Sequence, residues 1–176
     1  RVSERGQELA GIRTARVAKA VVGRSIVLPG EVGFNEDRRV HVTPRYGGII
    51  REMHGMLGAH VNKDDVLAVV ESNENLTSYD VCAPLSGRIV AREGAVGAYA
   101  SEESAIFVVA DLSSVWVALI VYPRHLADVR EGARAVIRGV GTPQTATGTI
   151  AYVAPVFDRD RRVALARVVL PNADGR

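Results

Sequence analysis

Residues 44–50 read PRYGGII and residues 84–90 read PLSGRIV, so one pattern of proline, glycine and paired aliphatic residues occurs twice. Each copy is followed by a second glycine, an acidic turn and an apolar run. The prolines of the two copies align at Pro44 and Pro84, and the second glycines align at Gly58 and Gly97. The two glycines lie one residue closer together in the sequence than the two prolines do. This difference indicates that the second copy has lost one residue in the loop before its second glycine. The chain therefore contains an internal repeat of two half-motifs.

Neither half-motif could bury both faces of its strands alone. We therefore expect the two halves to interlock about a pseudo-twofold axis into a flattened barrel. In each half, a proline and a glycine lead into a strand and a second glycine turns the chain. The structural turns of the repeat are assigned to Gly47, Gly58, Pro84, Gly87 and Gly97.

Short runs of valine, isoleucine and threonine, broken by Gly, Pro, Asn and Asp, favour strands over helices. The expected fold class is all-β with two short helices. One helix is predicted at Ser3–Leu9 and the other at Pro123–Val129, where Pro123 suits a first helical position. Strands are predicted at Ser25–Leu28, Val40–Thr43, Gly48–Met53, Val66–Val70, Gly87–Arg92, Ile106–Ala110, Val115–Val121, Thr147–Val153 and Val163–Leu170.

Composition limits the classes of function. The 176-residue chain is 47% hydrophobic and 24% charged, so it can bury a core. Its net charge of +2 is too small for a nucleic-acid-binding surface. No apolar run approaches the roughly 20 residues of a transmembrane helix. Cys82 is the only cysteine, so an internal disulfide is excluded, and this thiol is expected to be a small core residue.

The paired half-motifs resemble the biotinyl/lipoyl domain family. In its carrier subclass, a lysine at the hairpin tip between the halves is acylated. Here that connection, residues 71–80, reads ESNENLTSYD and contains no lysine, while Lys63 lies in a different turn. The carrier interpretation therefore lacks the amine that its chemistry requires.

The chain more fully resembles the membrane fusion proteins, which are the periplasmic adaptors of bacterial tripartite efflux pumps. Leu9–Thr14 and Leu28–Val32 look like the lead-in of adaptors for heavy-metal efflux. Glu71–Gly87 resembles the re-entry from the family's helical hairpin into the second half-motif. Motifs of the β-barrel domain that follows are matched by Leu112–Val117, Val129–Gly132 and Pro171–Gly175.

This resemblance implies a domain organisation. Residues 71–80 stand where the family carries its helical hairpin, which is missing or very short here. Adaptors of this type continue into further strands, so the barrel and the membrane-proximal region are expected to be incomplete. The implied parts are a lead-in segment at residues 1–21, a β-barrel domain at residues 22–40 and 111–176, and a lipoyl-like barrel-sandwich hybrid domain at residues 41–110.

The resemblance also implies a function. The chain would be a non-catalytic adaptor in the periplasm, associated with the inner membrane. It would link an inner-membrane, proton-driven RND exporter to an outer-membrane channel, with several copies forming a collar. Heavy-metal cations are the implied substrate, and no enzyme activity, cofactor or nucleic-acid partner is implied. The mechanism would be mechanical, since domains joined by paired β-linkers can flex.

Met53, His54, Met56 and His60 form a candidate metal site. Thioether and imidazole ligands suit copper(I), and imidazoles suit zinc. These residues support an alternative function, a periplasmic metal-binding module that delivers ions to the exporter. The simpler interpretation is that Met53 is a core strand residue and that both histidines are exposed loop residues. A lipoyl or biotinyl carrier domain is the third hypothesis.

Other candidate residues have simple structural interpretations. Trp116, in an alternating apolar strand, is interpreted as barrel core. His125 and Asp128, three residues apart on an expected helix, are interpreted as a surface pair. Residues 158–162, DRDRR, are interpreted as a solvated hairpin tip, with docking of a partner protein as the alternative. Residues 139–141 lack the following helix that a phosphate-binding loop requires.

Overall fold

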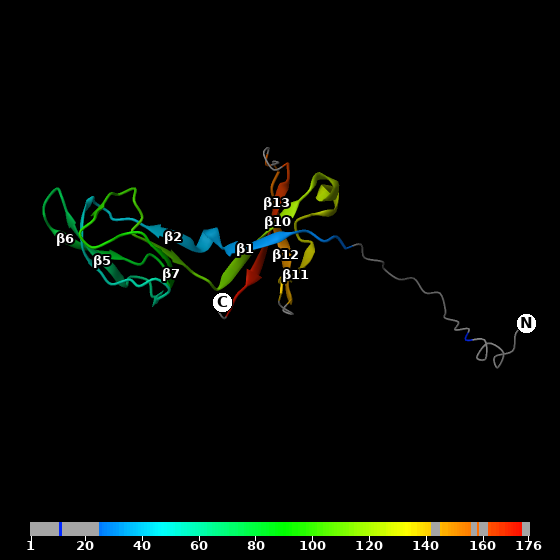
Figure 1. The fold of residues 1–176 in the computed structure, drawn as a ribbon, viewed down its shortest axis with the longest axis horizontal. Helices are drawn as coiled ribbons and strands as arrows, with labels where there is room; N and C mark the ends of the chain where they lie inside the picture. The colour runs from blue at the N-terminus through cyan, green and yellow to red at the C-terminus, as the bar shows by residue number, and fades with distance from the viewer. Residues whose placement is uncertain (1–10, 12–24, 142–144, 156–157, 159–161, 174–176) are drawn as a thin grey trace, which may run out of the picture.

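The computed structural model describes residues 11, 25–141, 145–155, 158 and 162–173. These residues form mostly β-strands, arranged as two units side by side along the long axis of the molecule (Figure 1). One unit contains β2 to β9, and the other contains β1 and β10 to β13. The predicted all-β fold class is confirmed. The helix predicted at Ser3–Leu9 lies outside the described residues.

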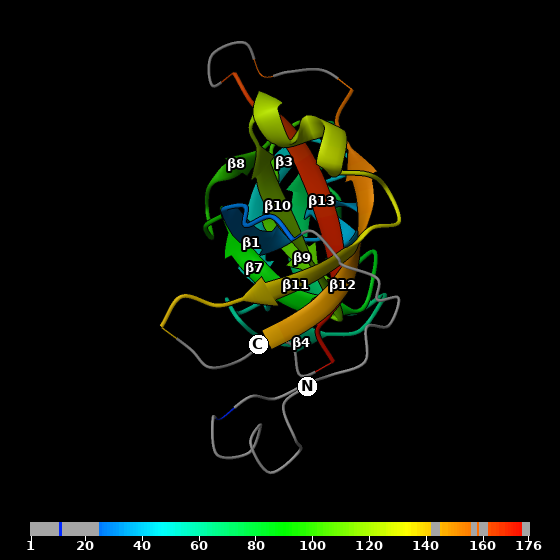
Figure 2. The same cartoon turned by 90° about the vertical axis from the view of Figure 1, so that its right-hand side faces the viewer.

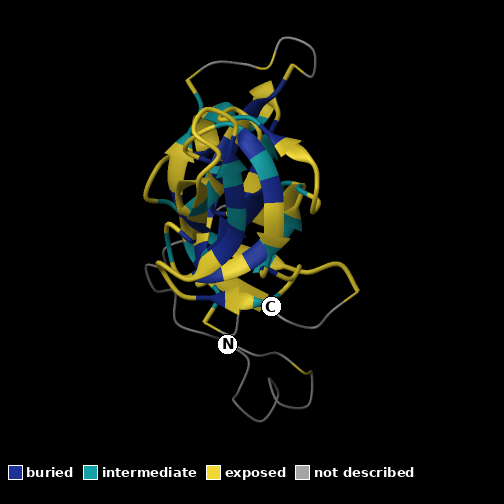
Figure 3. Ribbon diagram, turned by 90° about the vertical axis from the view of Figure 1, so that its left-hand side faces the viewer, coloured by how far each residue is buried: buried dark blue, intermediate teal, exposed yellow. Residues whose placement is uncertain are grey.

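The lipoyl-like unit consists of two four-stranded antiparallel sheets, in the orders β2-β9-β7-β4 and β6-β5-β3-β8. Figure 3 looks onto this unit and shows buried strand segments surrounded by exposed loops. Its strands are β2 (Arg39–Val42), β3 (Gly48–Met53), β4 (His60–Val61), β5 (Val66–Ser72), β6 (Ser78–Cys82), β7 (Gly87–Arg92), β8 (Tyr99–Ala100) and β9 (Phe107–Ala110).

The two half-motifs interlock, as the repeat predicts. The first half supplies β3, β4 and β5, and the second supplies β7, β8 and β9. β4 pairs with β7 and β8 pairs with β3, so each half adds its short strand to the other half's sheet. Ile50 and Ile89 occupy equivalent positions and are 1% and 0% exposed in the shared core. Each half therefore completes the sheet of the other.

The two halves keep one constant offset in the structure, which corrects the expected deletion in the loop. The N–H of Gly58 donates to the carbonyl of Ile89, and the N–H of Gly97 donates to that of Ile50, both at 2.8 Å. The two loops therefore make the same contact in opposite directions. Ile50 and Ile89 have the same separation in sequence as Gly58 and Gly97.

The same offset pairs Gly48, rather than Gly47, with Gly87. A Cβ atom on Gly48 would collide with the backbone carbonyl of Glu71, and one on Gly87 would collide with that of Ala110. Glu71 and Ala110 are themselves separated in sequence by this offset. The chance coincidence of prolines in the sequence shifted the predicted alignment by a single position.

The barrel unit is one five-stranded antiparallel sheet in the order β1-β10-β13-β12-β11, seen from its own side in Figure 2. Its core cluster is separate from that of the lipoyl-like unit and includes Val117, Val121 and Val168. Its strands are β1 (Gly30–Phe34), β10 (Ser114–Val121), β11 (Arg134–Arg138), β12 (Thr145–Val153) and β13 (Ala164–Pro171).

The described residues contain two 3-10 helices, η1 (Glu36–Arg38) and η2 (Pro123–Asp128). η2 lies at the position of the second predicted helix, with proline in its first turn, whereas η1 was not predicted. Both follow strands of the barrel unit. Within the part of the chain that the structure describes, no helix is long and apolar enough to cross a membrane.

Three sequence predictions about elements are wrong. Ser25–Leu28 is not a strand, and pairing begins only at Gly30, because Pro29 has no N–H to donate to a ladder. Arg39 and Val40 pair with β9, so they lie in the lipoyl-like unit rather than on the barrel side of a boundary after residue 40. Cys82 is exposed, because its neighbours on the strand are the residues that face the core.

Candidate interaction surfaces

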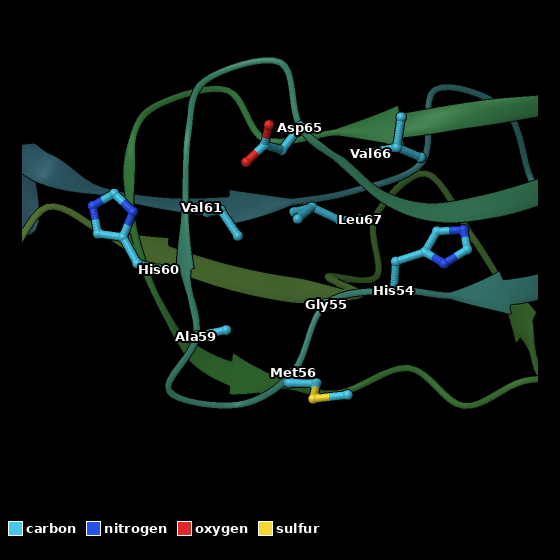
Figure 4. A pocket seen from close by; sticks show the side chains of 9 residues that line it. All are labelled: His54, Gly55, Met56, Ala59, His60, Val61, Asp65, Val66 and Leu67. Carbon is cyan, nitrogen blue, oxygen red and sulfur yellow. The ribbon is translucent and has the colours of Figure 1, made fainter.

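Three of the metal candidates lie around one open hollow of about 410 Å³ beside β3 and β5. His54, Met56 and His60 line it together with Asp65. Figure 4 shows the two imidazoles at opposite ends of the hollow, pointing in different directions. Within the described segments, no three His, Cys, Asp or Glu side chains come close enough to hold a metal ion.

Met53 does not line this hollow. It packs against the lipoyl-like core, and its sulfur accepts a 3.4 Å hydrogen bond from the Arg92 guanidinium. His54, which does line the hollow, has its Nε2 3.3 Å from a carboxylate oxygen of Glu52. The four candidate ligands are thus not directed at one point.

The connection at residues 71–80 is a closed β-hairpin. β5 and β6 pair up to Glu71 and Ser78, which leaves only residues 73–77 as a loop. The N–H of Ser72 donates to the carbonyl of Thr77 at 2.9 Å, and the hydroxyl of Ser72 accepts from the N–H of Glu74 at 3.2 Å. A tight turn therefore lies where the resemblance leads us to expect a helical hairpin.

Lys63 does not lie at this tip. Its N–H donates to the hydroxyl of Ser86 at 2.9 Å, in the turn before β5. That turn is at the opposite end of β5 from residues 73–77. The structure thus places no lysine of the repeat where a carrier domain presents one.

An aromatic tip, consisting of Tyr46, Leu76, Tyr79 and Tyr99, surrounds the β5–β6 turn. Tyr46 and Tyr79 meet edge to face, with centroids 5.9 Å apart, and the Tyr79 hydroxyl donates to the Tyr46 carbonyl. The Tyr99 side chain covers Gly47, whose carbonyl accepts from the turn itself. Tyr46, Leu76 and Tyr99 are 45%, 76% and 58% exposed.

This tip lies at the end of the lipoyl-like unit that is remote from the barrel (Figure 1). Sequence reasoning missed it, because its members come from three segments that are far apart in the sequence: Tyr46 before β3, Leu76 and Tyr79 around the β5–β6 turn, and Tyr99 in β8. The available signal was that three of the chain's five tyrosines lie next to segment ends of the repeat. Exposed aromatic groups of this kind are typical of protein interfaces.

Trp116 is buried but does not lie in the barrel core, which corrects the sequence interpretation. It is on the opposite face of β10 from Val117, and the Arg167 guanidinium lies 3.5 Å from its ring centroid. The same guanidinium lies 5.6 Å from the Tyr152 ring. Trp116, Tyr152 and Arg167, with the exposed Val136 and Val169, define the outer barrel face.

The remaining candidates have local partners. The Arg124 guanidinium donates to the imidazole of His125 at 3.0 Å. The N–H of Asp158 donates to Val163 and that of Arg162 donates to Asp158, at 2.9 Å and 2.7 Å. The other residues of the DRDRR segment lie outside the described residues.

Both units of the structure match known protein families. Residues 38–111 match the family described as "CzcB-like, barrel-sandwich hybrid domain", and residues 114–176 match the family described as "CusB-like, beta-barrel domain". The chain belongs to the membrane fusion protein family of periplasmic adaptors. This family is non-catalytic, so the expectation that the adaptor is not an enzyme is confirmed.

The adaptor is similar to two curated relatives. These are "Cation efflux system protein CzcB" of Alcaligenes sp. and "Cobalt-zinc-cadmium resistance protein CzcB" of Cupriavidus metallidurans. Each is 25% identical over 231 residues, covering 92% of the chain and 44% of the relative's length. The aligned region is longer than the 176-residue chain, so the relatives hold additional residues within it.

Solved structures share the adaptor's fold. ZneB from Cupriavidus metallidurans superposes with a TM-score of 0.73 at 20% identity, covering 85% of the adaptor chain and 91% of the other. A MacA-MexA chimeric protein containing the Pseudomonas aeruginosa MexA α-hairpin domain gives a TM-score of 0.69 at 16% identity, with coverages of 83% and 74%. The barrel-sandwich and barrel architecture is therefore shared.

Proposed function

We propose that the chain is the scaffold part of an adaptor that links an inner-membrane, proton-driven RND exporter to an outer-membrane channel. Several copies would form a collar in the periplasm, associated with the inner membrane. Heavy-metal cations are the proposed substrate class. The names of the two curated relatives, which refer to cation efflux and to cobalt, zinc and cadmium resistance, support this class.

One observation carries the scaffold function. The lipoyl-like unit retains the interlocked fold of a carrier domain, yet the turn at its tip holds no lysine. Without that amine, the tip cannot form the amide bond to a lipoyl or biotinyl group. A fold that retains its core but lacks the acylated group is available for assembly instead.

We assign the contacts with partners to two surfaces. The aromatic tip lies at one end of the molecule and is proposed to contact the outer-membrane channel. The outer barrel face, with Arg134 and Arg138 along its β11 edge, is proposed to contact the exporter. Arginine and aromatic side chains contribute strongly at protein interfaces, and the arginines would favour an acidic partner surface.

The metal-delivery function has weaker structural support. His54 and His60 point in different directions, and Met53 is engaged with Arg92. A mobile ion would meet single donors rather than a set of ligands. We retain this function as the alternative that the following experiment separates from the adaptor function.

The experiment is complementation and crosslinking in cells that lack the full-length gene. The wild-type gene is expected to restore growth in zinc, cobalt or cadmium and to crosslink to both the exporter and the channel. A combined His54→Ala, Met56→Leu, His60→Ala variant should restore growth equally well. Loss of growth with this variant, with crosslinks intact, would instead support metal delivery.

Surface variants test the assigned contacts in the same cells. Tyr46→Ser with Tyr99→Ser is expected to reduce crosslinking to the channel, and Arg134→Glu with Arg138→Glu to reduce crosslinking to the exporter. The matched control is Tyr122→Ser, which removes another exposed tyrosine, 43% exposed, outside both surfaces. If the wild-type protein crosslinked to neither partner, the adaptor proposal would be wrong.

A further inference from the structure

Two chain segments cross between the lipoyl-like unit and the barrel unit. One runs from β1 through η1 to β2, and the other runs from β9 to β10. They form the narrow connection at the centre of Figure 1. The N–H of Asp111 donates to the carbonyl of Arg38 at 2.9 Å, so the segments are paired where they leave the lipoyl-like unit.

Asn35 fixes the first segment to the second. Asn35 is 8% exposed and is one of two buried polar residues among those described. The amide nitrogen donates to the Ser114 hydroxyl at 2.8 Å, and the amide oxygen accepts from the N–H of Asp37 at 3.1 Å. A buried amide that uses both ends has one favourable orientation, so it resists rotation of the segments against each other.

Arg38 makes the second connection. One guanidinium nitrogen donates to the Asp111 carboxylate at 2.8 Å and to the Ser113 hydroxyl at 2.7 Å. The other carboxylate oxygen of Asp111 accepts from the N–H of Ser113 at 2.8 Å. The carboxylate therefore holds both the arginine of one segment and the backbone of the other.

Asn172, directly after β13, belongs to a third segment and bonds to the linker between β9 and β10. Its side-chain amide donates to the carbonyl of Leu112 at 2.9 Å, and its N–H donates to the carbonyl of Ser113 at 2.7 Å. The linker is thereby tied to the barrel sheet itself. Together Asn35, Arg38, Asp111, Ser113, Ser114 and Asn172 form what we term the junction brace.

We propose that the junction brace holds the lipoyl-like and barrel units at one fixed angle, so that they move as a single rigid body. Exposed ion pairs add little to stability, but several directional bonds across paired segments restrict their relative rotation. Any flexing on which the adaptor mechanism depends then takes place outside this junction. This inference concerns the chain alone and does not depend on the proposed exporter or substrate.

The test uses the native cysteine. Cys82 is exposed on the lipoyl-like unit, and Thr147→Cys adds a second site on an exposed position of the barrel. Nitroxide labels at both sites report the distribution of distances across the junction by pulsed electron resonance. The otherwise wild-type chain is expected to give one narrow distribution, and Asn35→Ala with Arg38→Gln to broaden it roughly twofold, as expected for units joined by an unconstrained linker.

The matched control is Arg51→Gln, which breaks an Arg–carboxylate pair of similar exposure. Arg51 bonds Glu71 at 2.6 Å and 3.1 Å within the lipoyl-like unit, away from the junction. The control should leave the distribution unchanged. Far-UV circular dichroism confirms that each variant is folded, and Arg38→Lys, which keeps the charge but loses the planar fork, should give an intermediate width.

A broad distribution in the otherwise wild-type chain, or an unchanged one in the brace variant, would overturn the proposal. Both results are measured on the isolated chain, without exporter or channel. Failure of the adaptor proposal in cells would therefore leave this measurement unaffected, and the two failures can be distinguished.

Discussion

Gly48 and Gly87 are required for space, whereas Gly58 and Gly97 are required for backbone conformation. A side chain at either of the first two positions meets a strand backbone. The other two have φ angles of 82° and 83°, in the left-handed region. Equivalent positions of the two halves thus hold glycine for two different physical reasons.

Gly48→Ala is expected to lower the free energy of unfolding of the lipoyl-like unit by about 3 kcal/mol, because the new Cβ can be placed only by moving β5. Urea denaturation followed by circular dichroism measures this. The matched control is Gly33→Ala, where no atom lies within 4 Å of the added Cβ. It should change stability by less than about 1 kcal/mol. Equal losses in both variants would contradict the steric explanation.

Asp111 makes the junction sensitive to acid. The N–H of Ser113, with smaller contributions from its hydroxyl and from Arg38, holds the pKa of Asp111 below its usual range. A carboxyl whose pKa is lower in the folded state stabilises that state above its unfolded pKa of about 3.9, and the contribution disappears as pH falls through the folded pKa.

The difference in unfolding free energy between wild type and Asp111→Asn should therefore be constant near neutral pH and decrease below about pH 4. Urea denaturation at a series of pH values measures it. Ser113→Ala keeps the backbone N–H, which is the largest cause, so it should retain most of the pH dependence. If the stability difference between wild type and Asp111→Asn increased as the pH fell, the predicted direction of the pH dependence would be wrong.

At the scale of elements, β10 and β13 are packed on both faces. Val117 and Val168 belong to the core on one side, while Trp116 and Arg167 stack on the other. Trp116 is only 9% exposed because Arg167 covers it. The outer side of this sheet is therefore ordered by a cation–π contact rather than by a second layer of strands.

Arg167→Ala should expose the indole, shift its fluorescence emission to longer wavelength and lower stability by about 1 kcal/mol. Trp116 is the chain's only tryptophan, so the signal has one source. Arg134→Ala, on β11 at the edge of the same sheet, is the control and should leave the emission unchanged. Equal shifts in the two variants would argue against a specific stacking contact.

The strands that sequence predicted are those with their own apolar pattern. β3, β5, β7 and β9 contain runs of aliphatic residues that bury a face wherever they pair. β4 and β8 have only two residues each and exist because they pair with the other half. No local pattern could reveal them.

Side-chain placement was harder to predict than strands. Alternation identifies two faces of a strand but does not say which faces the core, so Trp116 was placed on the wrong side. The thiol of Cys82 was likewise placed inward. The aromatic tip depends on separate chain segments that only the folded repeat brings together. The absence of a lysine at the tip, in contrast, can be predicted from the sequence, because it depends only on which residues form one turn.

At the scale of the whole molecule, the two units have separate hydrophobic cores. The junction brace between them consists of polar contacts among the two crossing segments and Asn172. In the folded chain the brace can fix the angle between the two units. It does not join their cores, so each core can unfold independently of the other. Two-state unfolding of the entire chain is not expected.

Val168→Ala, at a position that is 0% exposed, should lower the stability of the barrel unit by about 2 kcal/mol. Trp116 fluorescence reports this unit alone, whereas circular dichroism reports both. We expect Val168→Ala to shift the fluorescence transition and Gly48→Ala to leave it in place. Coincident shifts of both probes in both variants would show that the units unfold together.

The closed β5–β6 turn is a position at which a longer segment can be inserted without disturbing the sheet below it. Glu71 and Ser78 are paired at its base, so their Cα atoms lie about 5 Å apart. Any inserted segment that starts and ends this close together can replace the turn without disturbing the pairs below it. The turn is thus a site for insertions. A longer segment inserted there would extend the protein, while the two interlocked halves below it keep the same strand pairing.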